Sequence, residues 1–75
     1  MIEIDANEIL FDLVQKHPGV KEAMEAIGFV NIIKPGMLQS AGRIMTIKKG
    51  AKMKGIYWGR IESIFKEHGF IIKED

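Results

Sequence analysis

Basic residues in the middle of this 75-residue chain are the side chains best suited to do chemistry. Between Ala26 and Ile61 there is no aspartate or glutamate. The basic residues of this stretch are Lys34, Arg43, Lys48, Lys49, Lys52, Lys54 and Arg60. Acidic residues outnumber basic ones by six to two before the stretch and by four to two after it, so the whole chain carries only +1. Such a division indicates either an anionic partner for the middle of the chain or a fold that sets a basic middle against acidic ends.

Three of these lysines fall where helices are expected to begin. Lys34 precedes Pro35, and Lys48 and Lys49 lie in the first turn of a helix that Thr46 should cap. Positive charge at a helix start is unfavourable by about 0.3–1 kcal/mol per exposed residue. The same position also attracts anions, because free backbone N–H groups and lysines converge there. A binding surface and an ordinary solvated face both explain the pattern, and both stay open.

Trp58 is the aromatic residue that could add stacking to this surface. It stands beside Arg60, and we expect it to be partly exposed, whereas we place Tyr57 in the core. A nucleic-acid interface is an alternative, but the chain shows no recognition-helix signature and no aromatic pair of the kind found in RNA-binding sheets. The candidate binding residues are therefore Lys34, Arg43, Lys48, Lys49, Lys52, Lys54, Trp58 and Arg60.

The other polar residues form no recognisable catalytic constellation. His17 and His68 are the only histidines, and without cysteine they fall short of a zinc site, so we interpret them as residues at helix ends. Ser40 and Ser63 lack the glycines of a nucleophile elbow. The carboxylates have the spacing of solvated helix faces, and the glycines match no phosphate-binding loop. We therefore expect no enzyme, no cofactor and no metal.

Size and composition favour one small domain over residues 1–75 in the cytoplasm. The absence of cysteine rules out disulfides and thiol catalysis. The acidic start of the chain does not resemble a secretory signal, and the longest uncharged run, residues 26–33, is far too short to span a membrane.

Hydrophobic periodicity predicts an all-α fold, a bundle of about five short helices. Asp5 and Glu8 have the spacing of a capping box for the first helix, with Ile4 and Ile9 as its hydrophobic staple. The β-prone segments at the two ends of the chain could pair as short strands. The expected helices cover residues 6–16, 18–27, 35–41, 47–53 and 57–68.

Two helices are expected to end in the same way. Gly28 and Gly69 are each followed by phenylalanine, which predicts left-handed glycine caps with Phe29 and Phe70 folding back on the helix. The stripes of the long helices predict a core of Leu10, Leu13, Val14, Met24, Ile27, Phe29, Ile61, Ile64 and Phe65.

The order of these segments resembles the domain-of-unknown-function family numbered 1858, which is related to the hybrid-cluster-associated redox disulfide domain. The resemblance implies a compact helical fold, found alone or at the N-terminus of larger bacterial and archaeal proteins, with no established activity. Redox-type relatives carry a Cys-x-x-Cys pair where this chain has residues 30–33 without cysteine, so no disulfide or cluster is carried over. The segments that carry the resemblance are Ile9-Leu10, His17-Pro18, Met24, Gly28-Phe29, Pro35-Gly36-Met37, Gly42-Arg43, residues 50–55 and His68-Gly69-Phe70.

The expected function is that of a non-enzymatic interaction module. It would dock a protein partner, or a second copy of itself, through the basic middle of the chain, with no part in a membrane. A nucleic-acid-binding module and a sensor of a small anion at a helix start are the alternatives.

Overall fold

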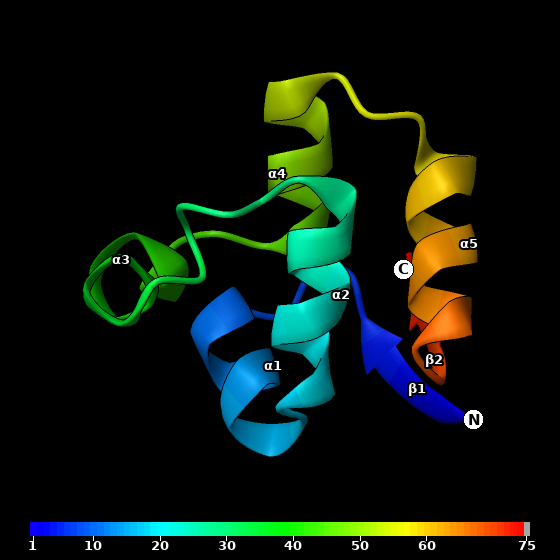
Figure 1. Ribbon diagram of the computed structural model, residues 1–75, viewed down its shortest axis with the longest axis horizontal. Coiled ribbons are helices and arrows are strands. Elements are labelled where there is room, and N and C mark those ends of the chain that lie inside the picture. Colours follow the sequence, from blue (N-terminus) through cyan, green and yellow to red (C-terminus); the bar gives the residue numbers. More distant parts are fainter. Residues whose placement is uncertain (75) are drawn as a thin grey trace.

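Five short α-helices and one pair of strands make up the chain in the computed structural model, which describes residues 1–74. In Figure 1, α2 lies between α1 and α5, and α3 stands to one side of the other helices. The mainly helical fold predicted from the periodicity is confirmed. The elements in chain order are β1 (Ile2–Asp5), α1 (Leu10–Lys16), α2 (Gly19–Ile27), α3 (Pro35–Ser40), the 3-10 turn η1 (Ala41–Arg43), α4 (Ile47–Lys54), α5 (Trp58–Glu67) and β2 (Phe70–Lys73).

The two ends of the chain pair as parallel strands. Ile2 lies opposite Phe70, and Asp5 lies opposite Lys73. The backbone N–H of Ala6 donates to the Lys73 carbonyl at 2.7 Å and continues the pairing beyond β1. The predicted pairing of the termini is therefore confirmed, and it holds β2 against α5.

One contiguous core lies between α1, α2, α4, α5 and the strand pair. All of the predicted core residues belong to it, although Val14 and Ile64 are only half-buried. Phe65 and Phe70 meet edge to face with ring centroids 6.2 Å apart, as the predicted ending of the last helix required. The core also takes in residues outside the predicted set, namely Ile4, Ala6, Val20, Ala23, Ile33, Leu38, Ile47, Ala51, Phe70 and Ile72.

Glycine ends α2 and α5 in the left-handed conformation. The φ angle is 118° at Gly28 and 88° at Gly69. After α2, the N–H of Phe29 donates to the Met24 carbonyl at 3.0 Å, which is the hydrogen bond of a Schellman ending. Both predicted glycine caps are confirmed.

Alanine at Gly28 or Gly69 should lower the free energy of unfolding by about 1 kcal/mol, because a Cβ is strained at positive φ. Gly36 is a matched control: it lies inside α3, its φ is not positive, and a Cβ there would meet no atom within 4 Å. Gly36→Ala should therefore stabilise the protein by up to about 1 kcal/mol, since alanine favours helix. Urea unfolding measures all three variants. Equal effects at Gly28 and Gly36 would contradict the assignment of the cap.

The first helix begins four residues later than predicted, so the capping box and its staple are wrong. The Asp5 carboxylate accepts the N–H of Asn7 at 2.8 Å, and the Asp5 carbonyl accepts the N–H of Glu8 at 3.1 Å. This turn, together with the strand pairing, keeps the segment before α1 out of a helix. Glu8 pairs instead with Lys16 at 2.7 Å, and this hydrogen bond and charge raise the pKa of the Lys16 ammonium. Ile9, the expected partner in the staple, remains 40% exposed.

Tyr57 also differs from its predicted position. Tyr57 is the residue before α5 and is 81% exposed, so its placement in the core is wrong. Its neighbour in the sequence, Ile56, packs against the core instead. His17 lies at a helix end as interpreted from the sequence: it follows α1, and its ring meets Phe70 edge to face at 6.0 Å.

Candidate functional site

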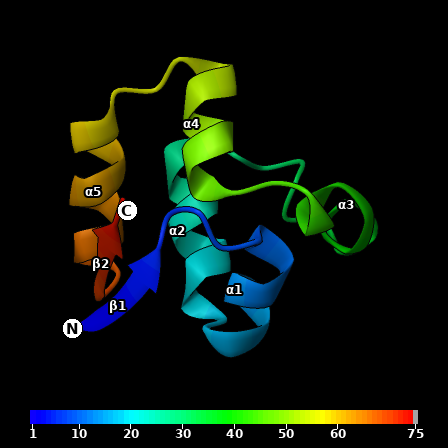
Figure 2. The same cartoon turned by 180° about the vertical axis from the view of Figure 1, so that it is seen from behind.

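An open apolar groove lies between α4 on one side and α3 with its preceding loop on the other. Its volume is about 300 Å³, and three of the chain's five methionines line it. Figure 2 shows α3 on one side of the molecule, connected to α2 and α4 by extended loops. We call this feature the methionine groove. It is lined by Phe29, Asn31, Ile32, Met37, Ala41, Met45, Gly50, Met53 and Lys54.

The floor of the groove depends on a glycine in α4. A Cβ at Gly50 would lie 3.1 Å from the ring of Phe29, which is tighter than an ordinary contact. Glycine thus lets the buried Phe29 ring pack directly on the helix backbone. Because the glycine cap at Gly28 fixes the position of Phe29, the ending of α2 also shapes the groove.

The walls of the groove carry large apolar side chains that water can reach. Met53 is 74% exposed and Met37 is 44% exposed, while Met45 is half-buried. Single exposed apolar residues are common on protein surfaces. Exposed methionines that share one groove are more informative, because methionine is flexible and polarisable and is frequent on surfaces that bind varied partners.

Lys54 brings positive charge into the groove. Its ammonium donates to the Gly28 carbonyl at 3.0 Å and lies 5.3 Å from the centre of the Phe29 ring. A cation suits this position, because the C-terminal end of α2 carries partial negative charge. None of the lining residues is acidic.

Three of the predicted binding residues lie together at the start of α4. Lys48, Lys49 and Lys52 line a shallow hollow with Asn7 and Thr46. Thr46 caps the helix as predicted, since its hydroxyl accepts the N–H of Lys49 at 3.0 Å.

The backbone donors at this helix start already have partners. The N–H of Lys48 donates to the Ala6 carbonyl at 3.2 Å, and the N–H of Gly50 donates to the Thr46 carbonyl at 2.9 Å. The N–H groups of Lys48 and Lys49, two of the donors that an anion would need, are therefore occupied, which weakens the case for a small-anion site.

The remaining predicted binding residues do not line the methionine groove. Arg43 stacks over the Phe11 ring at 4.4 Å and donates to the Gln39 carbonyl, so it joins η1 to α1. Lys34 is exposed at the residue before α3.

On α5, Arg60 is exposed. Trp58 is half-buried as predicted, and its Nε1 is buried with no hydrogen-bond partner among the described residues.

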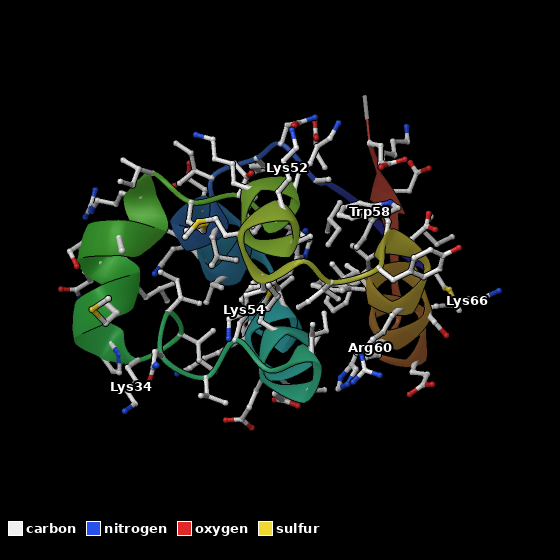
Figure 3. The ribbon with its side chains drawn as sticks, turned by 90° about the horizontal axis from the view of Figure 1, so that it is seen from above. Lys34, Lys52, Lys54, Trp58, Arg60 and Lys66 are labelled. Carbon is white, nitrogen blue, oxygen red and sulfur yellow. The ribbon has the colours of Figure 1, made fainter. Side chains whose placement is uncertain are left out.

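Helix geometry spreads the basic residues over more than one face. Figure 3 shows Lys52 and Lys54 on opposite sides of α4. Residues two positions apart in an α-helix differ by about 200° around its axis, which explains this arrangement. In the same view Arg60 points away from α5, at a distance from both. The lysines of α4 therefore divide into two sets. One group, of Lys48, Lys49 and Lys52, lies at the start of α4, and Lys54 lies apart from it in the methionine groove.

Sequence reasoning missed the methionines and Phe29 as site residues. A signal was present in the expected helix over 47–53, where Gly50 and Met53 fall on one side by their spacing of three. The sequence did not show which segment would face that side, since α3 reaches it only through a loop.

Two further features of the described residues bear on function. No group of three or more histidine, aspartate or glutamate side chains lies close enough together within residues 1–74 to hold a metal ion. Over the same range, no helix is long and apolar enough to cross a membrane.

The fold and the groove define a small helical domain with an apolar groove on its surface. Residues 4–61 match the family described as a domain of unknown function, DUF1858. The chain belongs to this family, and the resemblance seen in the sequence is confirmed. No curated protein and no solved structure matched the chain. The family match ends at Ile61, inside α5, although the core continues through Phe65 and Phe70.

Proposed function

We propose that this domain is a non-enzymatic, cytoplasmic interaction module that docks a protein partner through the methionine groove and the basic Lys54 that lines it. One observation carries the proposal: exposed methionines line an open apolar groove on a stretch of chain that has no carboxylate. Docking sites on proteins combine an apolar centre with a polar rim in this way.

The groove favours a protein partner over nucleic acid. A single-stranded nucleic acid needs aromatic platforms beside a basic track, whereas the lining here is aliphatic and the one aromatic ring in it, Phe29, is buried. Nucleic acid remains an alternative for the lysine group of Lys48, Lys49 and Lys52, which lies on a separate hollow.

Oligonucleotide titrations at two salt concentrations test the nucleic-acid alternative. We expect duplex and single-stranded oligonucleotides to bind more weakly than about 100 μM at physiological salt. Micromolar binding that falls steeply with salt, and that Lys48→Glu weakens, would overturn the proposal.

Selection of displayed peptides against the folded domain tests the proposal directly. We expect enriched peptides to lose at least about tenfold in affinity on Met53→Asp, because the substitution replaces an apolar contact by a carboxylate that binding would have to desolvate. Ile44→Asp is the matched control: Ile44 has the same 74% exposure but does not line the groove. Peptides that respond equally to the two variants would contradict the assignment of the groove.

A further inference from the structure

We infer that the methionine groove takes an acidic amphipathic helix of a partner protein. This inference rests on the proposed function and adds the chemistry of the partner. It follows from three properties of the groove: its apolar lining, the absence of a strand among the elements that line it, and its charge.

The lining requires apolar side chains from the occupant. Met37, Met45 and Met53 offer thioethers and methyl groups, and their flexible chains can adapt to leucine, isoleucine or phenylalanine. A volume of about 300 Å³ is small, so a few large side chains presented along one face would fill it.

The groove favours a helix over an extended segment. Its walls are α3, α4 and a loop, and the only strands of the described chain, β1 and β2, contribute nothing to it. An extended segment would bury backbone N–H and C=O groups against apolar side chains without partners, which is costly. A helix satisfies its own backbone hydrogen bonds and presents apolar residues at positions i, i+3, i+4 and i+7.

The charge of the groove favours carboxylates on the flanks of that helix. Lys54 lies in the groove, and none of the residues that line the groove is acidic. Opposite charges across an interface speed association and exclude basic competitors.

A second copy of the folded chain does not supply such a helix. The apolar stripes of α2 and α5 are already buried in the core, through residues such as Met24, Ile61 and Phe65. We therefore assign the helix to a partner rather than to a second copy of this fold.

Three synthetic peptides of 15 residues test the inference. The first has leucines at positions 4, 8 and 11 with glutamates on the flanks and alanine elsewhere, the second replaces every glutamate by lysine, and the third scrambles the leucine positions of the first. Calorimetry at low and high salt measures their affinities for the intact domain. We expect the acidic amphipathic peptide to bind at least about tenfold tighter than either of the others and to weaken as salt rises.

Matched variants connect the binding to the groove. Met53→Asp should weaken the acidic peptide at least about tenfold, whereas Ile44→Asp should leave its affinity unchanged. Equal binding of the acidic and basic peptides, equal binding of the scrambled peptide, or no binding at all would overturn the inference. If displayed-library ligands occupy the groove but prove basic or extended, this inference fails while the proposed function stands; if no library ligand occupies the groove, the proposed function fails as well.

Discussion

Replacing Phe65 by alanine should unfold most of the protein at 25 °C. Phe65 is fully buried on α5, and its ring meets Phe70 edge to face at 6.2 Å. Loss of a buried phenylalanine costs about 3–5 kcal/mol. A domain of this size has little more stability than that, because short chains bury a smaller share of their surface.

Urea unfolding followed by circular dichroism measures this loss. Tyr57→Ala is the control, since Tyr57 immediately precedes the same helix but is 81% exposed, and its removal should change stability by less than about 0.5 kcal/mol. A loss below about 1.5 kcal/mol for Phe65→Ala would show that the core does not centre on α5.

Ending the chain at Gly69 should have an effect of similar size. This truncation removes β2 and with it the buried side chains of Phe70 and Ile72, each of which contributes about 1.5–3 kcal/mol by burial. It also removes the partner strand that holds β1. The family match ends before this segment, so the experiment shows whether the stable unit extends beyond it.

A chain ending at Lys73 is the control for the truncation, because it keeps all of β2. Thermal unfolding should show a clear transition for this control and none, or one at a much lower temperature, for the chain that ends at Gly69. Similar transitions in the two would mean that the strand pair adds little to the fold.

Local signals in the sequence predicted the helix endings well. Gly28 and Gly69 need positive φ because of interactions within a few residues, and the Thr46 cap depends only on its own helix. The start of α1 was mispredicted because it depends on a distant segment: β2 pairs with residues 2–6 and keeps Asp5 in a strand.

The candidate site could be predicted only in part. Lys54 and the lysine group around Thr46 were identified from the charge pattern, but their separation onto different sides of α4 follows from helix geometry and from what packs on each side. The methionine groove depends on how α3 and its loop sit against α4. That arrangement joins residues from 29 to 54, and the spacing of Gly50 and Met53 in the sequence indicates only the side that α4 contributes.

The methyl signals of the methionines test the central claim most directly. The chain has five methionines, of which Met37, Met45 and Met53 line the groove, Met24 is buried in the core and Met1 lies in neither place. In a protein labelled with 13C at the methionine methyl groups, each signal can be assigned by a single Met→Leu variant. Adding the acidic amphipathic peptide should shift the three groove signals together and saturably, while the signals of Met24 and Met1 stay in place. Saturable binding that leaves the three groove signals unmoved would contradict the claim that this groove is the docking site.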